Sequence, residues 1–271
     1  MKKIIGEGSY KRVFLEEESG IEVAAMYPKR KNCRAQVIRE GEILAQFEHR
    51  NIPQLRNISK GKHVRISTEY IPGVTWKKRL EQTAAHQNYQ TRMHHSLHIM
   101  REVSQALVHA QEKGYVHLDL NPNNVLVVFE EGKLVRASVI DWAGSRKLKG
   151  ETEEGYFFTP EFSAPEIIYS DCTDTSDVYS LGVNFLYAIE GNAIFGDLKF
   201  DMKNKAKYPF QMGKRIPQEA DRLARKVDEE QDGLGSIVNK IGRLSINMVP
   251  GNRVDIEEFH NGINDCIRQF L

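Results

Sequence analysis

The first 28 residues alternate short apolar runs with glycine and charged residues. The strings KIIGEGSYKRVFL and IEVAAMY predict short β-strands within residues 3–15 and over 21–27, because apolar side chains recur at the spacing of half-buried strands. Glu18-Ser19-Gly20 predicts a hairpin turn between them. Apolar residues at helical spacing predict a helix over 33–47, and HVRISTEYI predicts a further strand over 63–71. We therefore expect the N-terminal part to be a sheet with one helix.

Beyond residue 71 the pattern becomes mainly helical. The string IPGV bends the chain away from the sheet, so we place a boundary between two lobes near Ile71. The elements predicted after it are helices over 76–80 and 93–113, strands over 125–129 and 134–140, and further helices from about residue 176. Residues 196–235 are rich in Lys, Arg, Asp and Glu and are predicted to form a solvated connector, which could also dock substrates.

The composition excludes several classes of protein. The chain has 271 residues, of which 40% are hydrophobic and 28% charged, values typical of a globular protein and not of a disordered, collagenous or coiled-coil chain. Its 38 Lys plus Arg against 37 Asp plus Glu give a net charge of +1, so no long-range field favours a nucleic-acid partner. No apolar run approaches the ~18 residues of a membrane span, and MKKIIGEGSY becomes polar before a signal core could form. We expect a cytoplasmic protein with neither a nucleic-acid nor a membrane partner.

The cysteine and histidine residues form no metal-binding pattern. The three cysteines are widely scattered: Cys33, Cys172 and Cys266. Three of the nine histidines lie on or beside the predicted long helix, without a matching carboxylate or cysteine pattern: His94, His95 and His98. We expect buried or idle thiols and a solvated polar helix face rather than disulfides or a zinc site.

Three segments carry residues suited to phosphate chemistry. In GEGSYKRV, Gly6 and Gly8 lie between two strand signals; glycines let a backbone close over phosphates, but such a pair is more often only a turn. In HLDLNPNN, Asp119 and Asn124 precede a strand at the spacing of a base and a metal ligand. In VIDWAG, a strand delivers Asp141 into a bend, as a Mg²⁺ site requires. Taken singly, each aspartate could equally be a helix cap or a solvated turn residue.

In this order and spacing the three segments resemble the protein kinase superfamily, and the resemblance extends over nearly the whole chain. TPEFSAPE at 159–166 resembles the end of an activation segment, and DVYSLG at 177–182 resembles the helix that braces the catalytic loop. Arg253 stands where the family pairs an arginine with the glutamate of its Ala-Pro-Glu motif, here Glu166. The resemblance implies that this pair is buried and architectural rather than catalytic.

The fold that the resemblance implies is α+β, a two-lobed protein kinase-like fold. We expect a single domain over residues 1–271, with an N-lobe over 1–70 that contains an antiparallel five-stranded sheet and one helix. The C-lobe over 71–271 is expected to be mainly helical. The resemblance also implies ATP and Mg²⁺ as cofactors and serine or threonine hydroxyls of a protein as the substrate.

The cation that holds the phosphates departs from the family pattern. Strand three of a typical kinase reads Val-Ala-Ile-Lys, but this chain has Met26 in place of the lysine, and a thioether carries no charge. A long ammonium side chain can reach the same place from a neighbouring strand, and Lys11 occupies the third glycine position of the loop. This arrangement is similar to the lysine-relocated WNK kinases, whose pattern Gly-x-Gly-Ser-x-Lys-x-Val is matched by Gly6, Gly8, Ser9, Lys11 and Val13. The alternative is that Lys11 is an exposed strand lysine.

The resemblance assigns further residues around Lys11. Glu40 is its expected acidic partner because of its spacing to a core leucine of the helix, with Glu42 as the alternative. The pair would form only when the helix moves inward, which would make it an on/off element. Thr68 matches the gatekeeper position, and the backbone from Glu69 to Ile71 is expected to contact adenine.

The catalytic loop supplies the remaining roles that the resemblance implies. Asp119 is placed to accept the proton of a substrate hydroxyl and to orient it for in-line attack, and Thr159 matches the threonine that steadies this aspartate in Ser/Thr kinases. Asn124 and Asp141 are expected to hold Mg²⁺. Asn121 replaces the lysine that ordinarily contacts the γ phosphate, so we expect slow chemistry, if any.

Two more departures keep other functions open. Leu118 replaces the arginine that clamps an activation-segment phosphate, so activation by loop phosphorylation is less expected, with Thr152 and Tyr156 as candidate sites. The Ile-Asp-Trp string that ends at Trp142 resembles small-molecule phosphotransferases such as aminoglycoside and choline kinases. The alternatives are therefore a metabolite kinase and a pseudokinase that binds nucleotide or partners without transfer.

Overall fold

The computed structural model describes residues 3–83, 86–148, 158–169, 172–195, 207–230 and 233–270. Thr152 and Tyr156, the two candidate phosphorylation sites, lie outside the described residues. Within these ranges no helix is both long and apolar enough to cross a bilayer.

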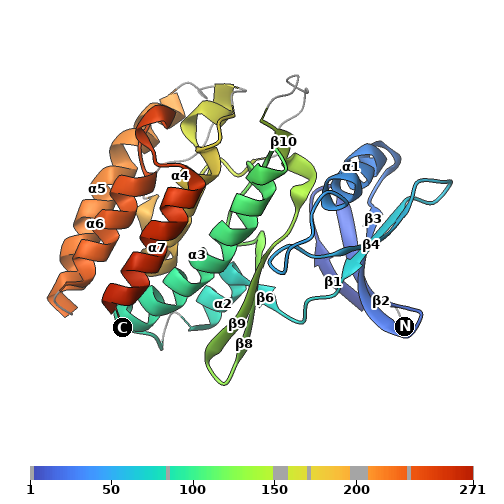
Figure 1. The fold of residues 1–271 in the computed structure, drawn as a ribbon, viewed down its shortest axis with the longest axis horizontal. Coiled ribbons are helices and arrows are strands. Elements are labelled where there is room, and N and C mark those ends of the chain that lie inside the picture. Colours follow the sequence, from blue (N-terminus) through green and yellow to red (C-terminus); the bar gives the residue numbers. More distant parts are fainter. Residues whose placement is uncertain are drawn as a thin grey trace.

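Five antiparallel strands form a sheet in the N-terminal part, at the right of Figure 1. In the spatial order β1-β2-β3-β5-β4 they are β1 (Lys3–Glu7), β2 (Lys11–Glu18), β3 (Ile21–Pro28), β5 (Arg65–Glu69) and β4 (Leu55–Ser59). The turn between β2 and β3 has positive φ angles of 51° at Ser19 and 82° at Gly20. Tight hairpins need such a backbone, so the predicted hairpin is confirmed.

One helix, α1 (Arg34–Leu44), packs against this sheet, within the range predicted for it. A Cβ atom added at Gly41 would lie 2.8 Å from Cδ1 of Ile66, so glycine at this position lets the helix approach β5 closely. The buried face of α1 also carries a carboxylate, Glu40, whose residue is 2% exposed. A buried charge of this kind requires a partner.

The rest of the described chain is mainly helical, as predicted. The helices are α2 (Trp76–Thr83), α3 (Tyr89–Glu112), α4 (Ser176–Glu190), α5 (Lys207–Glu230), α6 (Leu234–Ser245) and α7 (Ile256–Phe270). The short strands are β6 (Val74–Thr75), β7 (Tyr115–Val116), β8 (Val125–Glu130), β9 (Lys133–Val139) and β10 (Arg146–Lys147). α3 begins earlier than predicted because the side chain of Asn88 caps it, accepting a hydrogen bond from the backbone N of Thr91 at 2.9 Å.

The charged stretch predicted to be a solvated connector contains the long helix α5 instead. Its described part packs against α6 (Figure 1) and buries side chains that recur at helical spacing: Tyr208, Met212, Ile216, Leu223 and Val227. Charged residues occupy much of its other face. The prediction was wrong because it weighed the charge content of the segment above the spacing of its apolar positions.

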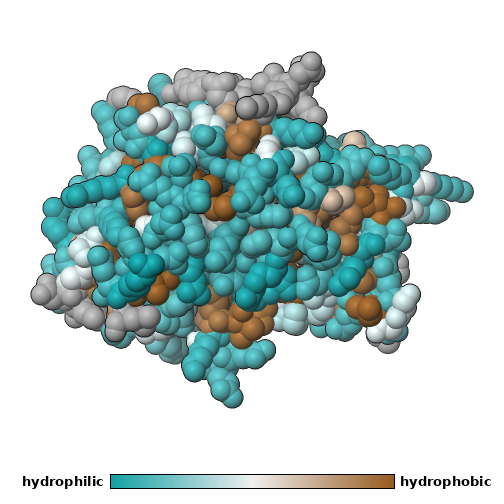
Figure 2. All heavy atoms as spheres, in the orientation of Figure 1, coloured by the Kyte–Doolittle hydropathy of each residue, from teal (hydrophilic) through white to brown (hydrophobic). Residues whose placement is uncertain are grey.

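A continuous hydrophobic core links the sheet to the helical part. Phe47, just after α1, and Trp142, just after β9, meet with their ring centroids 4.7 Å apart. The face in Figure 2 is mainly hydrophilic, with hydrophobic side chains in separate patches. The fold therefore fixes α1 against the loop that follows β9, and the candidate site lies at this junction.

Candidate active site

Lys11 begins β2 and turns its side chain into the protein. Only 7% of the residue is exposed; Nζ contacts both carboxylate oxygens of Glu40 on α1 and lies 3.0 Å from Oδ1 of Asp141. Burial alone would lower the pKa of Lys11, but the charges of Asp141 and Glu40 outweigh burial and raise this pKa above its ordinary value. Lys11 is therefore an ammonium group held between two carboxylates, and the alternative of an exposed strand lysine is wrong.

The neighbouring residues agree with this placement. Met26 of β3, at the position of the usual lysine, is 5% exposed and lies opposite Val13 of β2. Glu42 forms an ion pair with Lys60 in which both side chains are about half exposed. Glu40, and not Glu42, therefore faces the buried lysine.

Tyr10 is a member of this site that the sequence reasoning missed. The residue is 5% exposed. Its hydroxyl has one proton to donate, and it lies 3.1 Å from Oε2 of Glu40 and within hydrogen-bonding distance of Oδ1 of Asp141. Burial and the two carboxylates raise the pKa of Tyr10 far above its ordinary value, so the phenol keeps its proton. Strand alternation would put Tyr10 and Lys11 on opposite faces, but residues 9 and 10 form a bend before β2, so both side chains turn inward.

Asp141 follows β9 in the left-handed backbone conformation, with φ 66° and ψ 60°. This conformation is unfavourable for aspartate and is held by contacts around the preceding residue. The N–H of Ile140 donates to the carbonyl of Asn124 at 2.9 Å, and Nε2 of His117 lies 3.0 Å from the carbonyl oxygen of Ile140. Burial would raise the pKa of Asp141, but the charge of Lys11 lowers it below its ordinary value. The carboxylate is therefore ionised.

Asp119 accepts hydrogen bonds from three side chains. Thr159 Oγ1 donates to Oδ1 at 2.7 Å, and Asn124 Nδ2 donates to Oδ2 at 3.0 Å. Asn121 Nδ2 lies 3.2 Å from Oδ1 and 3.0 Å from the Thr159 hydroxyl. Burial raises the pKa of Asp119, and the hydrogen bond from Thr159 opposes this rise. The structure thus brings together the residues predicted around this aspartate and orients its carboxylate tightly.

The loop before Asp119 is braced by Asp177 at the start of α4. One carboxylate oxygen of Asp177 accepts from the backbone N of His117 at 2.7 Å, and the other accepts from the N of Leu118 at 2.9 Å. These bonds hold Leu118 at a φ of 68°, an unfavourable value for leucine. Its side chain is 2% exposed and belongs to the core, so no cation is available at this position.

The glycine hairpin leaves space that the protein itself does not need. Gly6 lies opposite Val13, and a Cβ added there would be 3.6 Å from the nearest Val13 atoms, an ordinary contact. Gly8 donates its N–H to the carbonyl of Lys11 at 2.9 Å, and a Cβ added there would meet no atom within 4 Å. Ser9 is exposed. Because neither packing nor a positive φ requires these glycines, their small size is available to a ligand under the hairpin.

The residues predicted to contact adenine lie at the end of the sheet. Thr68 is 4% exposed in β5, and the Glu69 carboxylate pairs with Arg136 of β9 through contacts of 2.5 and 3.0 Å. The carbonyl of Ile71 accepts from the N–H of Gly73 at 2.8 Å, whereas the N–H of Ile71 donates to no group among the described residues. Among the described residues, a backbone donor is therefore left without an acceptor in the segment that was predicted to contact adenine.

Glu166 and Arg253 form the predicted buried ion pair, away from the other site residues. The guanidinium contacts the carboxylate through both outer nitrogens, at 2.7 and 2.9 Å, and its side chain is 0% exposed. Ser176 Oγ also donates to the same carboxylate at 2.7 Å.

The side chains of Asn124 and Asp141 have oxygen atoms that could bind the Mg²⁺ of the Mg²⁺-nucleotide typical of this family. Within the described part of the chain, Oδ1 of Asn124 and Oδ2 of Asp141 receive no hydrogen bond, because the bonds of these side chains run through Nδ2 of Asn124 and Oδ1 of Asp141. Amide and carboxylate oxygens are the ligands that Mg²⁺ prefers. The backbone bond between Ile140 and Asn124 keeps the two segments adjacent.

Comparison with known proteins agrees with this geometry. Residues 1–258 match the model of the protein kinase domain. The chain is 29% identical over 201 residues to "Myosin light chain kinase 2, skeletal/cardiac muscle" of Rattus norvegicus, covering 72% of this chain and 32% of that protein. It is 27% identical over 200 residues to "Myosin light chain kinase family member 4" of Homo sapiens, covering 71% of this chain and 50% of that protein. It is 25% identical over 202 residues to "Probable serine/threonine-protein kinase gdt4" of Dictyostelium discoideum, covering 73% of this chain and 12% of that protein. The chain thus spans half or less of the length of these relatives, and it belongs to the protein kinase domain family.

Proposed function

We propose that this chain is an ATP- and Mg²⁺-dependent protein kinase that phosphorylates serine or threonine hydroxyls, with Lys11 in the role of the usual strand-three lysine. One observation carries the proposal: a buried ammonium from the glycine hairpin contacts Glu40 and Asp141 at once. In kinases a lysine that pairs with a glutamate of the N-lobe helix also holds the α and β phosphates. The contact between Lys11 and Glu40, which joins the hairpin to α1, supports this role.

Each predicted residue has a role that its contacts support. Asp119 orients the acceptor hydroxyl and takes its proton, and the hydrogen bond from Thr159 holds the carboxylate in one rotamer. Asn124 and Asp141 would hold Mg²⁺, which supplies positive charge to the phosphates when bound. Gly6, Gly8, Ser9 and Val13 would cover the phosphates, and the region of Thr68, Glu69 and Ile71 would receive the adenine. These assignments are proposals for this chain.

Two residues set expectations for rate and control. The side-chain amide of Asn121 donates hydrogen bonds to Asp119 and Thr159. Because it carries no positive charge, it cannot stabilise the charge of the transition state as a lysine would, so phosphate transfer is expected to be slow. Leu118 cannot bind a phosphate, so activity is expected without phosphorylation of the activation segment.

The proposal also includes that the chain forms a single kinase domain and that it is located in the cytoplasm. The division into an N-lobe over 1–70 and a C-lobe over 71–271, and the likeness to WNK-type kinases, are parts of the same proposal. Support for a serine or threonine acceptor comes from the relative named as a probable serine/threonine-protein kinase and from the contact between Thr159 and Asp119.

The test is phosphate transfer from labelled ATP to generic protein substrates and to the chain itself. We expect transfer by the wild type, a loss of about 10²–10⁴-fold in Asp119→Ala, and a strong loss in Lys11→Met. Lys60→Met, which removes an exposed lysine, is the matched control and should leave transfer unchanged. Calorimetric ATP binding without transfer would instead identify a pseudokinase, and transfer to metabolites but not to protein would identify a metabolite kinase. Equal signal from all four proteins would mean a contaminating kinase.

A further inference from the structure

The Tyr10 hydroxyl lies where two acidic side chains from distant segments meet. Its oxygen is 3.1 Å from Oε2 of Glu40 on α1 and within hydrogen-bonding distance of Oδ1 of Asp141, which follows β9. The Lys11 ammonium lies 5.2 Å from the centroid of the Tyr10 ring, so the ring packs beside the third charged member of the group. Tyr10 thus joins the glycine hairpin to both carboxylates.

The two oxygens of the Asp141 carboxylate have different surroundings. Oδ1 meets the Tyr10 hydroxyl and, at 3.0 Å, Nζ of Lys11. Oδ2 receives no hydrogen bond from the described residues, and the side chain is 25% exposed. Rotation of a carboxylate about its Cβ–Cγ bond has a broad minimum, so contacts rather than covalent geometry decide which oxygen faces the open side. Here the contacts to Oδ1 leave Oδ2 for a metal.

The phenol makes its contact without adding charge. Lys11, Glu40 and Asp141 together carry one positive and two negative charges. A second cation at position 10 would cancel the excess negative charge, and with it the attraction for a divalent ion. Burial and the charges of both carboxylates hold the pKa of Tyr10 far above its ordinary value, so Tyr10 stays a neutral donor.

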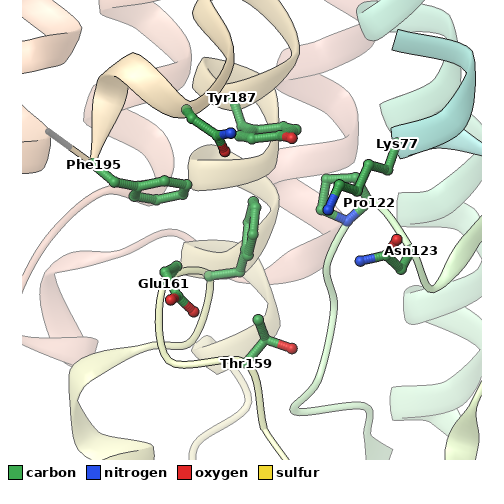
Figure 3. Close-up of a pocket in the computed structure, with 9 residues that line it drawn as sticks. Lys77, Pro122, Asn123, Thr159, Glu161, Tyr187 and Phe195 are labelled. Carbon is green, nitrogen blue, oxygen red and sulfur yellow. The ribbon is translucent and has the colours of Figure 1, made fainter. Parts of the chain in front are cut away.

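A cavity of about 370 Å³ beside the catalytic loop belongs to the other half of the site, with Thr159 and Asn123 in its wall (Figure 3). Thr159 donates to Asp119, the proposed proton acceptor, at 2.7 Å. Tyr10 is not among the described residues that line this cavity. We therefore expect Tyr10 to act on the metal side of the site and not on the acceptor hydroxyl.

We propose that Tyr10 is a positioning residue for the metal: its hydroxyl fixes the Asp141 carboxylate so that Oδ2 is available to Mg²⁺. The inference deepens the proposed kinase function and rests on its assignment of Mg²⁺ to Asn124 and Asp141. Groups that hydrogen-bond to a metal ligand orient it, and their removal typically lowers metal affinity by about 10–100-fold. Nucleotide binding should therefore respond more weakly to Mg²⁺ when the hydroxyl is absent.

The test is the binding of fluorescent mant-ADP to Tyr10→Phe, which removes one oxygen atom and keeps the ring. The affinity is measured in EDTA and then across a series of MgCl₂ concentrations. We expect the affinity in EDTA to match the wild type within about twofold and the half-saturating Mg²⁺ concentration to rise about tenfold. Mn²⁺ binding in the presence of ADP, measured by electron paramagnetic resonance, should show the same loss.

Tyr27→Phe is the matched control. It removes the same atom from β3, where the Tyr27 hydroxyl lies 3.0 Å from Oε1 of Glu16 and 3.0 Å from Nε of Arg65, and its Mg²⁺ dependence should equal that of the wild type. An unchanged half-saturating concentration in Tyr10→Phe would overturn the inference. So would a lower one, which would mean that the phenol competes with the metal. Equal weakening in EDTA and in Mg²⁺ would show a merely structural role and would also overturn it.

Phosphate transfer to a generic protein, measured on the same preparations, separates this inference from the proposed function. Transfer by the wild type, with the same Mg²⁺ dependence of binding in Tyr10→Phe, leaves the kinase function standing and removes the role of Tyr10. A Mg²⁺ dependence that Tyr10→Phe weakens, together with no transfer by the wild type, supports the role of Tyr10 and removes the catalytic proposal. Binding of mant-ADP to the wild type that does not respond to Mg²⁺ overturns the inference whatever the transfer assay shows.

Discussion

Two buried ion pairs of this chain, Arg253 with Glu166 and Lys11 with Glu40, differ in the net formal charge of the group to which each belongs. Arg253 and Glu166 form a pair with zero net formal charge. Lys11 contacts both Glu40 and Asp141, so the ionised group of three carries a net charge of −1. An uncompensated negative charge in a half-enclosed site attracts a cation, whereas a neutral pair does not.

The two pairs also differ in their surroundings: the first is enclosed by protein, and the second is open to solvent. Arg253 also donates to the carbonyls of Asn247 at 2.8 Å and Thr175 at 3.3 Å, and its guanidinium lies 4.9 Å from the ring centroid of Tyr179. Its hydrogen-bonding groups are directed at the protein. At the other pair, the Asp141 side chain is 25% exposed, so the group opens to solvent. The comparison predicts a structural role for Arg253 and a functional role for Lys11, and four substitution experiments test it.

Arg253→Met should have the largest effect, on stability. Removing one member of a buried pair leaves the other charge without compensation, and the free energy of unfolding should fall by about 3–5 kcal/mol. Urea unfolding followed by circular dichroism measures the change. Arg268→Met removes an arginine whose side chain is 76% exposed in its pair with Asp265 and should cause no measurable loss. Similar stability losses in the two variants would contradict the structural role.

Lys11→Met should act on activity more than on stability. Loss of a cation that stabilises transferring phosphate is expected to lower kcat/KM by about 10²–10³-fold. The stability loss should be smaller than in Arg253→Met, because Tyr10 still donates to Glu40 and because Glu40 can take up a proton. Single-turnover phosphate transfer measures the loss of activity, and urea unfolding of the same sample measures the change in the free energy of unfolding. A fully active Lys11→Met protein would remove the lysine assignment even if Asp119 proves essential.

Adding Met26→Lys to Lys11→Met should restore part of the activity, by about tenfold. The two positions lie on paired strands, with Met26 opposite Val13 and Lys11 opposite Pro28, and both residues are buried in the same region. An ammonium from either strand can therefore reach the carboxylates. Met26→Gln in the same background controls for polarity without charge. Recovery in the glutamine variant would show that a polar group at this position suffices without a positive charge. Recovery in neither variant would show that an ammonium at position 26 cannot take the place of Lys11.

Much of the fold could be predicted from periodicity. The alternation in β2 and β3 and the Ser19-Gly20 turn predicted the hairpin, and the apolar stripe of α3 predicted the central helix. β4 was not predicted from the pattern, because LRNIS has only two apolar residues and owes its place to pairing with β5. α5 was misjudged because its many charges masked a regular apolar stripe.

Site residues could be predicted where they belong to a motif of fixed order. They could not be predicted where their place in the site depends on contacts with residues distant in the sequence. The resemblance placed Asp119, Thr159 and Asp141 by position in a motif. The structure shows Thr159 donating to Asp119 and Lys11 close to Asp141, and the roles of these residues stay predictions. Tyr10 was missed because its partners lie 30 and 131 residues away, and no local pattern reports such contacts. His98 is partly buried and its ring packs on that of His94, with centroids 4.5 Å apart. This part of the helix face is therefore less solvated than predicted.

The smallest effect expected is a pH dependence of stability in Lys11→Met. Burial raises the pKa of Glu40 and Lys11 opposes that rise, so removing the lysine should raise this pKa further. The folded variant then binds a proton at a higher pH than the unfolded chain does. Its stability should increase as the pH falls through the folded pKa towards the ordinary value of 4.5.

The quantity to measure is the difference in unfolding free energy between Lys11→Met and the wild type at pH 7 and pH 5. We expect the deficit of the variant to shrink by about 1 kcal/mol at the lower pH. Other groups also contribute to the pH dependence in this window. Burial lowers the pKa of His98 to about 4 in the folded protein, whereas its ordinary value of 6.5 lies inside the window, but such groups are common to both proteins and cancel in the difference. Lys11→Met combined with Glu40→Gln lacks the Glu40 carboxyl but keeps that of Asp141, whose pKa Lys11 also lowers. The deficit of this double variant should therefore shrink less at pH 5 than the deficit of Lys11→Met, and the difference is the share of Glu40. A deficit that shrinks equally in the double variant would place the responsible proton elsewhere, and one that grows in acid would mean that Glu40 stays ionised without its lysine.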